Sequence, residues 1–337
     1  MSNKTTNGAR LGAKKLNMQA LLAPAALVIL YIFFCIASPY FAGLSYLQKI
    51  LESSYYIGFM AFGVTFIIIT GGIDLSLGTV MMASALLGAY TFKLGCPLIL
   101  SVLLTVGVAV AFGFINGILV AKLKLPPFIA TLGTQMMSVG LGSIITKVQS
   151  QVWPIATAEV GGWFKQVFFK ADILGIKGFP VGTLWLAAFF VIAALILHKT
   201  KLGRYFFAIG SNEEAARLSG IDVDKYKIYA YALSGFFVGM SALFYAAAYT
   251  TITPGQGAGQ EMNGITGVII GGTSMAGGSG TMVGTLIGVF IMSVLKNGLS
   301  ACGLQAEWQT FFTGIVVIGA VLLDIYRTKA ASKVKRT

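Results

Sequence analysis

Few residues in this sequence combine a reactive or charged side chain with an apolar setting, and Asp74 is the most conspicuous of them. It stands in GGIDLSLG (71–78), between two glycines and Ser76, at the joint of two apolar segments. A carboxylate that faces lipid is costly, so Asp74 must face water, protein or a helix end. Oxygens of Asp74 and Ser76 can accept hydrogen bonds from the amides that open the next helix. The pattern therefore predicts either a capped helix break or a ligand contact, and the residues alone leave both open.

Asn116, Gln135 and Asn263 are amide side chains in or directly beside apolar segments. Such groups either line a polar pathway and bind hydroxyl groups of a solute, or form hydrogen bonds between neighbouring helices. Together with Asp74 and Ser76, they are the residues that we predict for a translocation path.

The motifs of enzyme chemistry are absent from the sequence. It contains no G-x-x-x-x-G-K-[ST], no G-x-S-x-G and no H-E-x-x-H, and its one histidine cannot supply a catalytic triad or a two-histidine metal site. The three cysteines are scattered without metal-ligand or redox spacing. We therefore expect no catalytic residues, no metal site and no cofactor on this chain, and an enzyme is not expected.

One short segment is unusually polar for its surroundings. SNEEAARLSG (211–220) places Ser211 and Glu214 at the spacing of a capping box, and Gly220 follows where a helix of about two turns would end. A solvated loop would need no capped helix. The segment is predicted to form a short rigid helix that another protein can contact.

The elements that position these residues are membrane helices. Of 337 residues, 56% are hydrophobic and 10% are charged, the mean hydropathy is +0.83, and 42 residues are glycines. This composition predicts an all-α polytopic membrane protein with about ten transmembrane helices. The range 264–276 is short for a full crossing and is expected to be broken or re-entrant. The predicted ranges are 19–38, 56–70, 75–92, 97–121, 126–148, 181–197, 227–251, 264–276, 280–298 and 308–326.

Charge sets the predicted orientation. Basic cytoplasmic tails at 1–17 and 328–337 flank a single transmembrane domain at 18–327, with an extracytoplasmic loop at 149–180 and a cytoplasmic loop at 198–227. The proposed cytoplasmic pieces, which also include the turn with Lys122 and Lys124 and the chain from Arg327 onward, hold 17 of the 24 lysines and arginines. The positive-inside rule explains this placement, and with it the net charge of +13, without any nucleic-acid partner. Both termini are therefore expected in the cytoplasm.

Glycine spacing predicts where helices pack closely. Pairs four residues apart occur in three of the predicted spans, and small residues at this spacing let helix backbones approach. The stretch GVTFIIITGG (63–72) also resembles GITGVIIGG (264–272), which fits either an internal repeat or convergence of glycine-rich membrane sequence. The glycines concerned are Gly113 and Gly117, Gly235 and Gly239, and Gly280, Gly284 and Gly288.

Lysines in the extracytoplasmic loop depart from the charge rule. Lys165, Lys170 and Lys177 lie on the predicted outer side, where they are candidates for steering acidic surfaces of a binding protein. An ordinary solvated loop remains the alternative.

Four motifs in order give the chain a family resemblance. GGIDLSLG (71–78), KLPPFIATLGT (124–134), GRYFFAIGSNEEAARLSGI (203–221) and GGTSMAGGSGTMVGTLIG (271–288) resemble the ribose/galactose-type permeases of bacterial ABC importers. The likeness covers roughly residues 20–327, although the tail and the 149–180 loop match no motif.

The resemblance carries expectations about partners. It implies a homodimer of ten-helix subunits in the bacterial cell membrane, two cytoplasmic ATPase domains that hold ATP and Mg, and an extracytoplasmic sugar-binding protein. The segment 211–220 resembles the coupling helix, which sits in a cleft of the ATPase. Its residues are Ser211, Asn212, Glu213, Glu214, Ala215, Ala216, Arg217, Leu218, Ser219 and Gly220.

In the expected mechanism, a partner protein supplies the free energy that drives the conformational change. Moving a two-state equilibrium from 1:99 to 99:1 takes roughly 5.5 kcal/mol of differential binding, which a chain without a nucleotide site must obtain from a partner. We expect ATPase dimerisation to pull the 211–220 helices together and tilt the attached spans. Ribose is the expected substrate. A nucleoside or branched-chain amino-acid permease and an ion-coupled secondary carrier are the alternatives.

Overall fold

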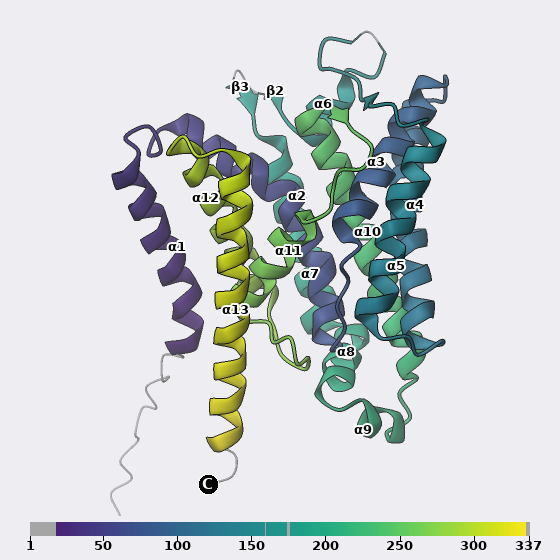
Figure 1. Cartoon of the computed structure of the whole chain (residues 1–337), viewed down its shortest axis with the longest axis vertical. Helices are drawn as coiled ribbons and strands as arrows, with labels where there is room; N and C mark the ends of the chain where they lie inside the picture. The colour runs from purple at the N-terminus through teal and green to yellow at the C-terminus, as the bar shows by residue number, and fades with distance from the viewer. Residues whose placement is uncertain (1–17, 159, 174–175, 335–337) are drawn as a thin grey trace, which may run out of the picture.

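The computed structural model describes residues 18–158, 160–173 and 176–334 (Figure 1). The predicted tail at 1–17 lies outside these residues, as do residues 335–337 of the second tail. The rest of that tail is not separate, because the last helix continues through it to Val334. The helices are α1 (Met18–Ala37), α2 (Leu44–Ile69), α3 (Leu77–Lys93), α4 (Leu98–Ala121), α5 (Pro127–Ile145), α6 (Trp163–Phe168), α7 (Val181–Lys199), α8 (Lys201–Ser211), α9 (Glu213–Leu218), α10 (Val223–Tyr249), α11 (Gln260–Ile270), α12 (Met282–Ala301) and α13 (Ala306–Val334).

Four short strands interrupt the helical pattern. β1 (Gln151–Val152) pairs antiparallel with β4 (Thr251–Ile252), and β2 (Ala171–Ile173) pairs antiparallel with β3 (Ile176–Phe179). With α6, the strands β2 and β3 lie at the end of the molecule opposite α9 (Figure 1). The predicted loop 149–180 therefore contains local structure, and β1 ties it to the segment that follows α10.

Within the described residues, seven helices are long and apolar enough to cross a membrane. Each of the other predicted ranges also contains a helix, but α3, α11 and the apolar part of α1 are shorter. α2 begins at Leu44 rather than at residue 56, because Lys49 and Glu52 interrupt the apolar run without interrupting the helix. The seven are α2, α4, α5, α7, α10, α12 and the Ala306–Tyr326 part of α13.

The core is built around α2. This helix is almost wholly buried, and it packs against α7, α10, α11 and α12. Aromatic rings fill the contact with α10: the ring of Phe59 stacks on that of Phe244 with centroids 4.6 Å apart, and Phe62 meets Phe237 edge-on at 6.2 Å. Such pairs add to the burial of apolar surface and fix how α2 and α10 lie together.

The predicted glycine pairs face each other across helix contacts. A Cβ on Gly117 would stand 2.8 Å from the Cα of Ile228, and one on Gly239 would stand 2.7 Å from the Cα of Val106. These glycines therefore allow α4 and α10 to touch along their backbones, as the spacing predicts. Gly284 and Gly288 do the same for α12 against Gly271 and Gly267 around α11.

The two halves of the suspected repeat end their first helix in the same way. After α2, Gly71 adopts φ +79°, and the amides of Gly71 and Gly72 donate to the carbonyls of Ile68 and Ile67. After α11, Gly272 adopts φ +94° and the equivalent two bonds form. Both are Schellman endings, in which a left-handed residue closes the helix. The chain then turns at the α9 end of the molecule and enters α3 or α12 (Figure 1).

Candidate functional site

The polar segment of the sequence forms part of a small helical projection, which we call the α8–α9 knob (201–222). It protrudes at one end of the helix bundle (Figure 1). The helix predicted at 211–220 is present as α9 (Glu213–Leu218), and a further helix that was not predicted, α8 (Lys201–Ser211), precedes it. Seven of the eight residues from Ser211 to Leu218 are exposed, and Leu218 is 84% exposed.

The predicted cap of this helix is wrong by one residue. Ser211 remains in α8, and Asn212 is the N-cap of α9, with its Oδ1 accepting from the amide of Ala215 at 2.9 Å. Because Ser211 keeps helical geometry, its side chain is not placed to cap α9, and the capping box with Glu214 does not form. Gly220 does close the segment, with φ +82° and with its amide donating to the carbonyl of Arg217.

Ion pairs fasten α9 to the bundle. Lys227 lies 2.5 Å from Glu213, and Arg217 lies 3.1 Å from Asp224 and 3.6 Å from Glu213. Lys124, in the connection between α4 and α5, lies 2.6 Å from Asp224. Exposed pairs are weak one at a time, but together they give one orientation to a helix of only six residues.

The pKa of Glu213 reflects this setting. Partial burial of its carboxyl raises the pKa, but the hydrogen bond and charge of Lys227, with the charges of Lys124 and Arg217, outweigh burial and hold it below the usual value of 4.5. Glu213 is therefore ionised, and paired, throughout the neutral range.

The inner end of α8 touches two helix breaks. A Cβ on Gly210 would collide with the carbonyl oxygen of Ile69, the last residue of α2. The same carbonyl accepts from the amide of Gly278 at 2.9 Å, and a Cβ on Gly278 would lie 2.6 Å from the Oγ of Ser211. The knob therefore contacts the end of α2 and the loop that precedes α12 directly through its backbone.

Asp74 forms a closed network where α2 is followed by α3. It is 2% exposed; its Oδ1 accepts from the Ser76 amide at 2.8 Å and from the Ser76 Oγ at 2.6 Å, and its Oδ2 accepts from Asn116 Nδ2 at 3.1 Å. Asn116 Oδ1 in turn accepts from Thr134 Oγ1 at 2.7 Å. Asp74 thus binds the amide of the residue before α3, while the Ser76 side chain makes no cap. Each of these polar side chains has a hydrogen-bond partner within the protein. This favours a capped helix break at Asp74 over a contact with a ligand.

The other predicted pathway residues lie apart from this network. Gln135 is half-buried on α5, and its side chain forms no hydrogen bond among the described residues. Asn263 lies on α11, where its Nδ2 donates to Gln260 Oε1 at 3.3 Å. Sequence reasoning missed Glu261, which is 3% exposed and accepts from the amide of Gly259. The sequence feature that could have pointed to Glu261 is a carboxylate just ahead of the short apolar range 264–276.

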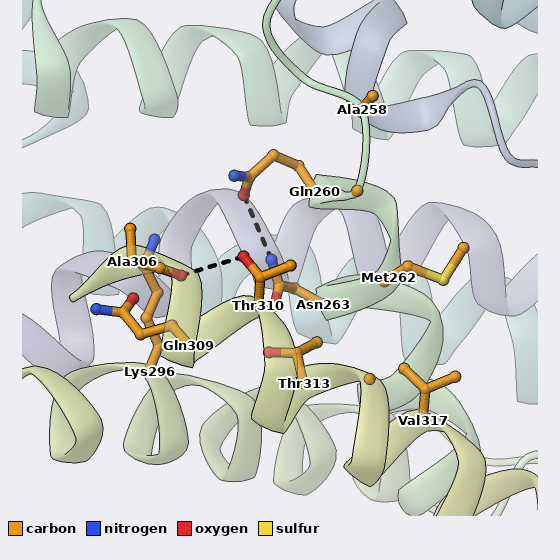
Figure 2. Close-up of a pocket in the computed structure, with 12 residues that line it drawn as sticks. Ala258, Gln260, Met262, Asn263, Lys296, Ala306, Gln309, Thr310, Thr313 and Val317 are labelled. Carbon is orange, nitrogen blue, oxygen red and sulfur yellow. Dashed lines mark hydrogen bonds between the residues drawn. The ribbon is translucent and has the colours of Figure 1, made fainter. Parts of the chain in front are cut away.

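Asn263 lines a cavity of about 380 Å³ among α11, α12 and α13, which we call the α13 cavity (Figure 2). Polar side chains from the first turn of α11, the last turns of α12 and the first turns of α13 meet there. Lys296 of α12 lines the cavity, donates to Tyr56 OH at 2.5 Å, and has no carboxylate within ion-pair distance among the described residues. A lysine within the predicted span 280–298 was the signal for this site. The polar lining consists of Gln260, Asn263, Lys296, Gln309, Thr310 and Thr313.

The outer lysines are largely engaged within the chain. Lys170 forms an ion pair with Glu52, and Lys165 Nζ donates to Thr250 Oγ1 at 3.4 Å. Lys177 belongs to β3, and its side chain lies outside the described residues. Their role in contacting a binding protein stays a prediction.

The fold and these sites define a class of protein. The chain combines a bundle of apolar helices long enough to cross a membrane, a polar cavity among three of its helices, and a charged knob against helix ends. The chain belongs to the family described as the branched-chain amino acid transport system / permease component, which matches residues 46–321.

Three relatives that are named for a sugar resemble the chain over most of its length. The chain is 38% identical to the ribose import permease protein RbsC of Bacillus subtilis (strain 168), over 93% of this chain and 94% of that protein. It is 34% identical to RbsC of Escherichia coli (strain K12), over 96% and 99%. It is 33% identical to the fructose import permease protein FrcC of Rhizobium meliloti, over 84% and 78%. The chain is a membrane permease of the ABC importer class, for which ATP hydrolysis is the task of a separate ATPase subunit.

Proposed function

We propose that this permease carries a monosaccharide, and that its substrate is ribose. The observation that carries the proposal is the identity of 38% and 34% to two ribose import permeases across nearly the full length of each. The relative that imports fructose supports the monosaccharide class at a greater distance.

A second candidate comes from the description of the family, which names branched-chain amino acids. The first relatives of this chain carry sugar names instead, and the α13 cavity has a lining of amide and hydroxyl groups that suits hydroxylated solutes. We therefore place the amino-acid substrate second.

For energy coupling, we infer that α9 sits in a cleft of the ATPase subunit. Leu218 offers an exposed apolar contact on a helix that ion pairs hold in one orientation. When the ATPase closes, the knob moves, and Gly210 passes that movement to the end of α2 and to the loop at Gly278. The pull tilts α2, α11 and α12, of which α11 and α12 line the polar cavity.

The translocation path follows the α13 cavity in this proposal, in place of the Asp74 network. Lys296 and the polar face of α13 are expensive toward lipid, because the bilayer offers them no hydrogen-bond partners. A second copy of the chain placed against α13 would cover this face, which supports the homodimer. The assembly lies in the bacterial cell membrane with the knob and both termini in the cytoplasm, and a sugar-binding protein delivers substrate to the other side.

Transport in a reconstituted system tests the function. Proteoliposomes that contain the permease, its ATPase and the sugar-binding protein are loaded with ATP, and uptake of radiolabelled ribose is measured against leucine and adenosine. The expected result is ATP-dependent ribose accumulation that a protonophore leaves unchanged. Accumulation of leucine or adenosine without ribose would refute the substrate, and uptake driven by an ion gradient without ATP would refute the class of transporter.

A further inference from the structure

A second cavity lies at the end of the bundle opposite the knob, and we call it the outer pocket. It has a volume of about 150 Å³, and its walls come from the first half of α2, the end of α10 and the last turns of α12. Pockets for drug-sized ligands measure roughly 300–1,000 Å³, so the outer pocket has room for one small molecule. None of the residues predicted from the sequence to line a path lies in it.

Aromatic rings form one side of the outer pocket. Tyr56 and Tyr249 line it with ring centroids 6.1 Å apart and planes inclined by 68°, and Tyr245 packs against both. Tyrosine combines an apolar ring with a hydroxyl group. Tyr56 is 1% exposed and backs this wall, whereas Tyr249 is 47% exposed and can offer its ring face to the C–H groups of a ligand and its hydroxyl group to a polar edge.

Asn297 contributes an acceptor. Its Nδ2 donates to Ser53 Oγ and to the carbonyl of Ser293, both at 2.8 Å, which uses both amide hydrogens. Among the described residues its Oδ1 accepts no hydrogen bond. The amide is thus held by two bonds on its nitrogen side while its oxygen remains available to a hydroxyl donor.

The outer pocket presents charged groups of both signs to a ligand. Lys49 and Lys296 line it, but so does the carboxylate of Glu52, which is paired with Lys170. A neutral molecule with several hydroxyl groups can donate to Glu52 and Asn297 and can accept from Lys296, so each group finds a partner.

Lys296 connects this pocket with the α13 cavity, because the same side chain lines both. A small solute that leaves the outer pocket on this side therefore meets Lys296 next, and then the polar lining of the larger cavity.

From this arrangement, we propose that the outer pocket is a subsite at which the permease itself binds a single polyhydroxylated molecule of the monosaccharide class, with Asn297 and Tyr249 as specificity-determining residues. This inference rests on the proposed function and deepens it. It adds a selection step within the membrane subunit, after release from the binding protein and before entry to the α13 cavity.

Direct binding to the full chain tests the subsite. The permease–ATPase complex is prepared in lipid nanodiscs without glycoside detergent and without the sugar-binding protein, and saturation-transfer NMR is recorded with D-ribose. Signal from the ribose C–H protons is expected for the wild type and for Tyr249→Phe, which keeps the ring. At least a fivefold loss is expected for Tyr249→Ala and for Asn297→Leu. Tyr40→Ala, at a tyrosine that is 78% exposed, is the matched control and should bind as wild type.

The outcomes separate this inference from the proposed function. If complete proteoliposomes take up ribose but the wild-type complex gives no ribose signal, or if Tyr249→Ala and Asn297→Leu bind as wild type, the subsite is refuted while the function stands. If leucine gives the signal and ribose does not, the ligand class is refuted. If no monosaccharide is taken up by the complete system, the proposed function fails first. Thermal unfolding of each variant shows whether a loss of signal reflects misfolding, and Tyr249→Ala decides the matter if Asn297→Leu does not fold.

Discussion

The Asp74 network and the α8–α9 knob are both rich in polar and charged side chains, but they satisfy these groups in opposite ways. Within the network, buried carboxylate, hydroxyl and amide groups bind one another. On the knob, α9 keeps Leu218 exposed while ion pairs fix the helix beneath it. The apolar interior requires internal satisfaction because no solvent can supply it, whereas the surface can leave groups free for a partner. Closed bonding therefore indicates a structural role, and exposure on a fixed element indicates a role in binding.

The largest expected effect follows from opening the closed network. Asp74→Leu leaves the donors of Ser76 and Asn116 buried without an acceptor, at a cost of about 1–3 kcal/mol for each group. We expect a strong fall in folded yield and in melting temperature, measured by fluorescence-detected size exclusion and thermal unfolding in nanodiscs. Asp74→Asn keeps one acceptor oxygen and should be far milder. A ligand-contact role for Asp74 would instead leave the Asp74→Leu protein stable and reduce transport alone.

The exposed contact of the knob should behave in the reverse manner. Leu218→Asp places a charge on the surface proposed to enter the ATPase, so we expect at least a tenfold weaker affinity for the ATPase, about 1.4 kcal/mol, with an unchanged melting temperature. Leu218→Met keeps an apolar side chain at the same position and serves as the control. Equal affinities for the wild type and Leu218→Asp, measured by biolayer interferometry, would remove α9 from the interface.

The cap of α9 gives a smaller effect that tests the geometry. Asn212→Ala removes the acceptor of the Ala215 amide, which costs about 1 kcal/mol and loosens a six-residue helix. We expect a two- to fivefold lower rate of ATP-driven uptake, with Asn212→Ser close to wild type. Ser211→Ala should have little effect on uptake, and a larger loss for Ser211→Ala than for Asn212→Ala would return the cap to Ser211.

The smallest effect concerns pH. The folded pKa of Glu213 is depressed below 4.5, so its pairing contributes to stability above that value and is lost only as the pH falls through the lower folded value. Between pH 7 and pH 5, the mobility of a spin label at Ala215 on α9 should stay constant, and it should rise only below pH 4.5. An increase in mobility near pH 6 would mean that Glu213 does not hold the helix.

Much of the fold could be predicted from the sequence, because apolar length and glycine spacing report directly on membrane helices and their contacts. The pairing of Gly117 and Gly239 with partner backbones is an example. Helix ends were harder to place. α2 continues through Lys49 and Glu52, and α9 starts one residue late, because a helix end depends on tertiary contacts as well as on side-chain type.

The site was predictable only in part. Asp74, Ser76 and Asn116 are brought together, but Asn263 belongs to another cavity, and Lys296 was passed over as an ordinary member of an apolar span. Which polar residues share a cavity depends on how α11, α12 and α13 pack, and one sequence does not encode that in any local pattern. The contact of Gly210 with Ile69 is equally invisible, since 141 residues separate them.

That contact gives the most direct test of the account, in which the knob transmits the movement of the ATPase to the helices around the cavity. Gly210→Leu forces α8 away from the end of α2, while Gly107→Leu adds the same side chain to α4 where nothing lies within 4 Å. ATP hydrolysis and ribose uptake are measured in the same proteoliposomes for the wild type and both variants. The account predicts that Gly210→Leu keeps ATP hydrolysis but lowers ribose uptake per ATP at least tenfold, with Gly107→Leu unchanged. Wild-type uptake per ATP in a folded Gly210→Leu permease would contradict it.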